Sequence, residues 1–167
     1  MKTQDKKEEI KEEVTSGDYS SVDFHNVDFD VRNTTYAGLS DGITYSRNPE
    51  KLVGKTIRVR GFAIKEADYL LDGVFAIGKY LISCCAADAE VTGFFAVCDD
   101  MSSIQENAWY EVEGVLELGE DSYGNKVLVI RVLHYKTISS KTENLYVYPC
   151  YSYGDGSCKQ ILDYNLN

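Results

Sequence analysis

The feature that most constrains the fold is a series of five segments in which apolar and polar side chains alternate along the chain. Alternation with a period of two is typical of a β-strand that buries one face and leaves the other accessible to solvent. In the first segment Ile57 and Val59 lie on one face, and Arg58 and Arg60 lie on the other. The sequence therefore predicts five strands, which cover residues 56–63, 73–82, 92–97, 109–118 and 126–135.

The order of these strands predicts a small closed barrel. Residues 99–107 separate the third strand from the fourth, and Ser102 and Gln105 have the spacing of a capping box, so we expect a short helix there. Gly61 and Gly114 fall in mid-strand, where glycine permits the bends by which a small barrel closes. We therefore predict a mainly β, OB-fold-like domain: a five-stranded Greek-key barrel with a short helix and an N-terminal strand and helix extension.

The first and fourth strands are neighbours in such a barrel. Arg58 and Arg60 are therefore expected opposite Glu111 and Glu113 on its outer face. We interpret this arrangement as ion pairs on a solvated sheet rather than as a phosphate-binding surface. The apolar side chains of the fourth strand are expected to point inward, and they are Tyr110, Val112, Leu116 and Leu118.

The N-terminal extension begins with an alternating segment at residues 27–31, which predicts a half-buried strand. A short helix is expected after it, because Leu39, Ile43 and Tyr45 are spaced for one helical face. The Pro49 that follows ends or restarts this helix.

Composition divides the chain into three parts. Residues 1–17 predict a charged, disordered tether, because they carry too few apolar side chains to pack against a core. Residues 18–149 are expected to form a single barrel domain with its extension, and residues 150–167 a C-terminal tail. No secretory signal pattern opens the chain. We expect either a cytoplasmic protein or, in preference, one whose export or anchor segment is missing from this chain.

The charge balance argues against several functions. Lys and Arg number 17 against 27 Asp and Glu, a net charge of -10, and such a surface repels nucleic acid and anionic membranes. No apolar run approaches the roughly 18 residues of a membrane helix, so direct membrane insertion by this chain is not expected. The common catalytic motifs are absent, and His25 and His134 are better explained as surface or partly buried side chains. We therefore expect a protein that is not an enzyme.

Two adjacent cysteines are the main candidate site. Successive side chains of a regular strand point to opposite faces, so Cys84 and Cys85 cannot both act as ligands unless the strand ends there. The small residues that follow predict such a break, and a turn would bring the sulfur atoms close to the Asp88 carboxylate. This set suits zinc or a similar ion. The alternative is structural: one thiol is buried, the other is half-exposed, and Asp88 caps the turn.

The other three cysteines have different expected roles. Cys98 ends the third strand, on the order of 20 Å along the ladder from Cys85, so it is interpreted as a small buried residue. Cys150 and Cys158 flank a glycine-containing turn, which predicts a disulfide if the domain functions outside the cytoplasm. Two free thiols in the tail are the alternative.

Four segments resemble one known family. They are Asn48-Pro-Glu-Lys-Leu-Val-Gly-Lys-Thr56, Arg60-Gly-Phe62, Gly78-Lys-Tyr-Leu-Ile-Ser-Cys-Cys-Ala-Ala-Asp-Ala89 and Tyr146-Val-Tyr-Pro149. Over residues 27–149 the chain resembles the C-terminal domain of the YcgQ-type permease-subunit family. The resemblance implies a membrane-associated protein on the extracytoplasmic side, with a multi-span permease as its partner. The chain departs from the family in having no membrane segment ahead of the domain and in carrying residues 150–167.

Three classes of function remain open. The first is a non-enzymatic, membrane-tethered accessory domain that binds a metal ion or presents thiols to a transport partner. The second is a redox or metal-handling protein that acts alone through Cys84 and Cys85. The third is a barrel that binds a small ligand or a protein and whose cysteines are structural.

Overall fold

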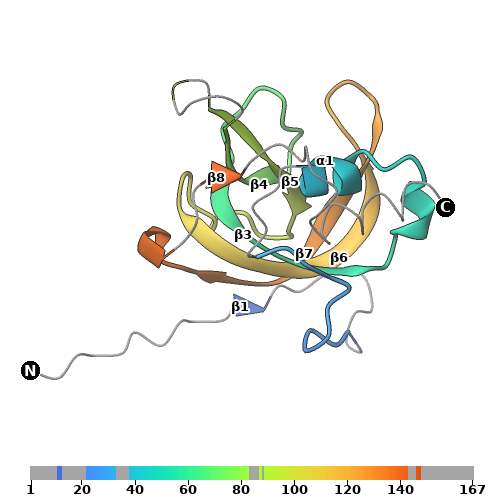
Figure 1. Ribbon diagram of the computed structural model, residues 1–167, viewed down its shortest axis with the longest axis horizontal. Coiled ribbons are helices and arrows are strands. Elements are labelled where there is room, and N and C mark those ends of the chain that lie inside the picture. The colour runs from blue at the N-terminus through green and yellow to red at the C-terminus, as the bar shows by residue number, and fades with distance from the viewer. Residues whose placement is uncertain are drawn as a thin grey trace, which may run out of the picture.

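The chain folds around a barrel of long strands (Figure 1). The computed structural model describes residues 11–12, 22–32, 38–82, 87, 89–142 and 146–147. The barrel strands are β3 (Thr56–Ile64), β4 (Val74–Leu81), β5 (Glu90–Val97), β6 (Trp109–Glu120) and β7 (Lys126–Thr137). The other described elements are β1 (Lys11–Glu12), β2 (Phe29–Asp30), α1 (Gly38–Thr44), the 3-10 helices η1 (Pro49–Lys51) and η3 (Ser140–Thr142), and β8 (Tyr146–Val147).

Hydrogen bonding between neighbouring strands closes the barrel. The pairs β3–β4, β4–β5, β3–β6 and β6–β7 are antiparallel, and β5 and β7 are parallel. The order around the barrel is therefore β3, β4, β5, β7, β6 and back to β3, which is the Greek-key order of an OB-type barrel. The predicted fold class is confirmed, including the pairing of the first and fourth predicted strands.

Apolar side chains from every barrel strand meet in one core. Ile57 and Val59 of β3 are buried, as the alternation predicts. The register of the β6–β7 ladder shifts where Glu113 pairs with His134 and Gly114 pairs with Val132, so Leu133 of β7 is the extra residue of a bulge. A Cβ atom at Gly114 would lie 2.2 Å from the carbonyl oxygen of Arg131, so the close approach of β6 and β7 requires glycine there.

The N-terminal extension belongs to the same core. β2 pairs in parallel with β3, and it brings Phe29 and Val31 into the core. α1 packs against β5 and β7 and buries Ile43. Pro49 begins η1, where proline fits because its missing N–H is not needed. The predicted strand and short helix are therefore present ahead of the barrel.

Short strands lie at two further edges of the sheet (Figure 1). β1, which falls within the predicted tether, pairs with β7 beside His134 and Tyr135. β8 pairs with β4 beside Tyr80 and Leu81. Within the ranges that the structure describes, no helix has the length and apolarity needed to cross a membrane.

The helix predicted between the third and fourth strands is wrong. Residues 99–107 form turns, in which the Ser102 amide and hydroxyl both donate hydrogen bonds to the Asp100 carboxylate. Ile104 from this segment is buried in the barrel core. The burial of Ile104 stabilises the irregular path of this segment by more than the predicted helix cap would stabilise a short helix.

Leu118 was expected to point into the core, and this is wrong as well. Its side chain is 44% exposed. β3 pairs with β6 only as far as Val115, whereas β6 and β7 remain paired to Glu120. Leu118 therefore lies on a hairpin that extends past the end of the barrel.

Candidate functional site

A groove crosses the outer face of β4 and β5. Its volume is about 370 Å³, within the range of roughly 300–1,000 Å³ that is typical of ligand pockets. The groove is bounded by the β3–β4 loop, the tip of the β6–β7 hairpin and the end of α1. Figure 1 shows the two loops at the same end of the barrel. These are the strands and loops with which OB-type barrels hold ligands.

Two glycines form the floor of the groove. Gly78 and Gly93 face each other across the β4–β5 ladder. A Cβ atom at Gly93 would lie 2.0 Å from the carbonyl oxygen of Ile77, and one at Gly78 would lie 2.7 Å from that of Thr92. Because the backbones approach so closely, side chains are excluded here and the floor stays bare. Phe95 extends the floor as an apolar surface.

Three tyrosines stand at the edges of the groove. Tyr45 follows α1, Tyr69 lies in the β3–β4 loop, and Tyr123 lies at the tip of the β6–β7 hairpin. Their exposed fractions are 53%, 42% and 84%. Rings from three separate segments thus border one groove, and each offers an apolar face for stacking and a hydroxyl group for hydrogen bonding.

Asp121 shapes the loop that carries Tyr123. Its carboxylate accepts hydrogen bonds from the backbone N–H groups of Tyr123 and Asn125, both at 2.9 Å, and from the Asn125 side chain at 3.0 Å. These bonds, the one from the Asn125 side chain first, lower the pKa of Asp121. The Asp121 carboxylate is therefore ionised and is engaged by its own loop.

Tyr69 keeps its phenolic proton over a wide pH range. Burial raises the pKa of Tyr69, and the nearby Glu106 carboxylate raises it further. Glu106 also accepts hydrogen bonds from the backbone N–H groups of Lys65 and Glu66. The loop that carries Tyr69 is thereby anchored where it leaves β3.

A buried hydroxyl without a partner lies at the α1 end of the groove. Thr44 lines the groove and is 3% exposed, and its Oγ1 atom makes no hydrogen bond to a described residue. One turn earlier in α1, the Ser40 hydroxyl lies 3.2 Å from that of Thr92 on β5. Buried hydroxyls are normally hydrogen-bonded. Thr44 therefore distinguishes this end of the groove from an ordinary packed surface.

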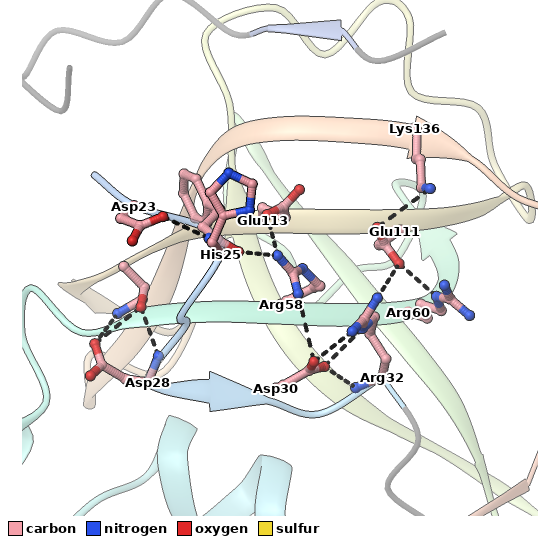
Figure 2. Close-up of polar contacts among 12 residues, drawn as sticks. Asp23, His25, Asp28, Asp30, Arg32, Arg58, Arg60, Glu111, Glu113 and Lys136 are labelled. Carbon is pink, nitrogen blue, oxygen red and sulfur yellow. Dashed lines mark hydrogen bonds and ion pairs between the residues drawn. The ribbon is translucent and has the colours of Figure 1, made fainter. Parts of the chain in front are cut away.

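A second polar cluster lies on the outer face of β3, β6 and β7 (Figure 2). Glu111 is at its centre, with 7% of its side chain exposed. Its carboxylate lies 2.7 Å from Arg60 Nε, 3.6 Å from Arg32 Nη1 and 3.7 Å from Lys136 Nζ. A buried carboxylate requires such partners, because leaving water without them is very unfavourable.

Arg58 organises the rest of this cluster. Its guanidinium lies 3.0 Å from the Glu113 carboxylate and 3.6 Å from that of Asp30, and it also donates a hydrogen bond to the carbonyl oxygen of Phe24 (Figure 2). Asp30 pairs with Arg32 at 2.7 Å, and the hydrogen bond from Arg32 lowers the pKa of Asp30, against the opposing effect of burial.

The cluster tests one sequence prediction in detail. Arg58 and Arg60 do face Glu113 and Glu111 across the β3–β6 ladder, so that prediction is confirmed. The face is not a solvated sheet, however, because Phe24 contacts Arg58 and the His134 ring on this face, and Asp30 and Arg32 join the ion pairs. We interpret the cluster as a clamp that holds the extension on the barrel, and the groove as the candidate functional site.

The predicted metal and disulfide residues lie outside the described residues, and they are Cys84, Cys85, Asp88, Cys150 and Cys158. Within the described parts of the chain, no group of three or more His, Cys, Asp or Glu side chains is placed to hold a metal ion. Cys98 is buried, at 7% exposure, and its Sγ atom lies 3.4 Å from the carbonyl oxygen of Asp100. It is the small buried residue that the sequence predicts.

The alternation of the sequence does not single out the groove, although a signal for it is present. In an OB-type barrel the loops after the first and fourth strands border the binding face. Each of these two loops carries a tyrosine, Tyr69 and Tyr123 respectively. Gly78 and Gly93, within the second and third strands, mark the bare floor between the loops.

These features define a small OB-type β-barrel domain with a groove on its β4–β5 face. The family model of the DUF1980 C-terminal domain matches residues 4–149. The chain therefore belongs to this family, which is the YcgQ-type family that its sequence resembles. Neither the curated proteins nor the solved structures include a significant match to the chain.

Proposed function

We propose that this domain is a non-enzymatic binding module that holds a small uncharged ligand in the β4–β5 groove. The observation that carries the proposal is the convergence of three exposed tyrosines on a bare glycine floor. An apolar floor with a few polar groups around it is typical of ligand pockets. The β4–β5 face is also the one that OB-type barrels use for binding.

The charges around the groove support an uncharged ligand. Among the described residues that line it, Asp121 is the one charged side chain, and its carboxylate is bonded within its own loop. Single-stranded nucleic acid requires a basic track beside the stacking rings. No Lys or Arg is found in the described lining of the groove, and the chain carries a net charge of -10.

Membership of the family supports a second, wider proposal. We propose that the domain is the soluble part of a membrane-associated permease accessory subunit on the extracytoplasmic side. The groove then holds a compound that the multi-span permease transports. Co-purification of the chain with a multi-span permease, from solubilised membranes, tests this partner. Recovery of the chain without the permease would contradict the partnership and leave the groove proposal standing.

Zinc binding by Cys84, Cys85 and Asp88 stays a separate prediction from the sequence. Calorimetric titration of the reduced chain with zinc tests it, repeated with Cys85→Ser and Asp88→Ala. We expect the heat of binding to fall in both variants. Equal, weak heats in all three proteins would identify the two cysteines as packing residues.

Ligand binding in the groove is tested by NMR titration of the ¹⁵N-labelled chain with three sets of uncharged compounds. The sets are neutral sugars, N-acetylated dipeptide amides and planar heteroaromatic amides. We expect at least one set to shift the backbone signals of residues 91–95 and 121–123, which line the groove.

Two lysine substitutions locate the binding. Val91 lines the groove and is 45% exposed, so Val91→Lys places a charge in the groove without disturbing the core. Val53, 43% exposed and outside the described lining, provides the matched Val53→Lys control. We expect Val91→Lys to abolish the shifts and Val53→Lys to keep them. Absence of shifts with every set, or equal shifts in both variants, would contradict the proposal.

A further inference from the structure

We infer that the ligand of the groove is a neutral saccharide. This inference rests on the proposed function and goes beyond it by naming the class of ligand. Two independent features of the groove point to it: the tyrosine rings at its edges and the unpartnered hydroxyl of Thr44. A sugar ring combines an apolar face of C–H groups with a girdle of hydroxyl groups, so one ligand satisfies both features.

The tyrosines stand on segments that the fold holds in place. Tyr123 is 84% exposed at a hairpin tip that Asp121 holds in shape through three hydrogen bonds. Tyr69 stands on a loop that Glu106 anchors, and Tyr45 follows the end of α1. Tyrosine side chains on such ordered loops lose little conformational freedom when they stack on a ligand, because each has only two rotatable bonds. The C–H face of a sugar fits such rings, and the glycine floor gives the sugar ring room between them.

Thr44 calls for a ligand with polar groups as well as an apolar face. Its hydroxyl is buried and lacks a partner among the described residues, which is unfavourable in the unliganded protein. Threonine in a helix divides between two χ1 rotamers, so the hydroxyl turns without a change in the backbone. A sugar hydroxyl at the α1 end of the groove supplies the missing hydrogen bond. A purely apolar ligand leaves it unsatisfied.

Charge and strand pairing exclude the main competitors. An anionic ligand meets no Lys or Arg in the described lining, and it is repelled by the net charge of -10. A peptide that adds a strand to the sheet needs unpaired strand backbone, but β4 and β5 pair with each other along their whole length, from Val74 to Leu81 on β4. The groove therefore contacts a ligand through side chains, including hydroxyl groups, and not through unpaired strand backbone. Tyr69, at the edge of the groove, adds a phenol that stays protonated and is able to donate a hydrogen bond to the ligand.

The test is calorimetric titration of the full chain with trisaccharides of matched size. The neutral probes are cellotriose, maltotriose and triacetylchitotriose, and the anionic probe is trigalacturonate. We expect a neutral probe to bind with a Kd on the order of 0.1–1 mM, because the contacts of an open groove must first offset the cost of immobilising the ligand. The anionic probe is expected to bind at least about tenfold more weakly, because of the charge repulsion.

Two variants with matched controls assign the contacts. Tyr123→Ala removes one stacking ring and Thr44→Val removes the buried hydroxyl, and each is expected to weaken binding about three- to tenfold. The controls are Leu118→Ala, 44% exposed outside the described lining, and Thr137→Val on the exposed end of β7. Both controls are expected to bind as tightly as the native chain.

Three other outcomes would overturn the inference in distinguishable ways. Shifts with dipeptide amides or heteroaromatic amides, together with no binding of any trisaccharide, would make the saccharide inference wrong and leave the proposed function standing. Failure of every compound class would make both wrong. Saccharide binding unchanged in Tyr123→Ala and Thr44→Val would locate the sugar away from the groove.

Discussion

Arg60 on β3 and Glu111 on β6 face each other across the barrel ladder, and the arginine Nε donates a hydrogen bond of 2.7 Å to the Glu111 carboxylate. The same carboxylate faces Lys136 of β7 and Arg32 of the N-terminal extension. One buried negative charge therefore balances cations from two strands and from the segment that crosses them (Figure 2). This shared partner links the extension to the barrel.

Removal of the Glu111 carboxylate tests this link. In Glu111→Ala the three cations lose their shared partner, and we expect the free energy of unfolding to fall by about 2–3 kcal/mol. The loss is below the full cost of breaking a buried pair, because the cations remain partly exposed. Urea unfolding measures it. Glu120→Ala, at the exposed end of the same strand, is expected to change the value by less than about 0.5 kcal/mol, and equal losses would contradict the clamp.

The extension also contributes to stability through its apolar side chains. Phe29 is 1% exposed and belongs to the barrel core, although it lies ahead of the first barrel strand. Phe29→Ala is expected to destabilise the protein by about 3–5 kcal/mol, the usual range for removing a buried ring. Thermal and urea unfolding measure this change. Val53→Ala, at a position that is 43% exposed, serves as the control, and a similar effect of both substitutions would show that the extension is not part of the core.

The floor of the groove depends on the absence of side chains. A Cβ atom at Gly93 would meet the Ile77 carbonyl oxygen at 2.0 Å, and neither backbone can yield without breaking the ladder. We expect Gly93→Ala to destabilise the barrel by about 3 kcal/mol or more. At Gly119 the nearest atom is a methyl group of the Val129 side chain at 3.0 Å, so a side-chain atom rather than the backbone would have to shift, by a few tenths of an ångström. Gly119→Ala is therefore expected to lower the stability much less than Gly93→Ala does. The difference between the denaturation midpoints of the two variants shows how much the close approach of the backbones at Gly93 matters.

The lowered pKa of Asp30 predicts how acid affects the clamp. The hydrogen bond from Arg32 is the main cause of this lowering. A carboxyl group with a lower pKa in the folded state binds protons more readily when unfolded. Its stabilisation is therefore present above its ordinary pKa of about 3.9 and is lost as the pH falls through the folded value.

Asp30→Asn tests this pH dependence. The Asp30 side chain is 39% exposed, so solvent screens the pair and we expect a small loss of stability at pH 7. The difference in stability between the native chain and the variant should shrink as the pH falls from about 4 through the folded pKa of Asp30, below which the carboxyl group is protonated in both the folded and the unfolded native chain. The melting temperatures of the native chain and of Asp30→Asn, recorded as a function of pH, measure this difference in stability. Asp68→Asn, at an exposed position with no ion pair to a described residue, is the control, and a difference that is constant with pH would contradict the role of Asp30.

The barrel could be predicted from the sequence because each strand buries one face and the period of two records that burial. The same pattern set the register in which Arg60 meets Glu111. It could not show that this face is covered, because the cover depends on where residues 22–32 lie. Alternation identifies Phe29 as a buried side chain, but not its parallel pairing with β3. The helix predicted at residues 99–107 is wrong because the burial of Ile104 in the core decides the path of this segment. The spacing of residues within the segment carries no information about that burial.

The groove was harder to predict for a different physical reason. The groove arises from the space that Gly78 and Gly93 leave because they have no side chains. It also depends on two loops whose distance from each other is set only when the barrel closes. Tyr69 and Tyr123 are far apart along the chain, and neither position has a periodic pattern that marks it. Cross-strand pairing, rather than spacing in the sequence, brings them to one surface.

The hydroxyl of Thr44 leads to a prediction that separates binding from stability. Thr44 is 3% exposed, and its Oγ1 atom has no hydrogen-bond partner among the described residues, so the hydroxyl lowers the stability of the unliganded protein. Thr44→Val removes that polar atom with little change in shape, and we expect the free energy of unfolding to rise by about 1 kcal/mol, or the Tm by about 2–4 °C. Differential scanning calorimetry without ligand measures it, with Thr137→Val as the exposed control. A fall in Tm specific to Thr44→Val would mean that the hydroxyl is already satisfied, and the groove would then lose the polar group that calls for a ligand.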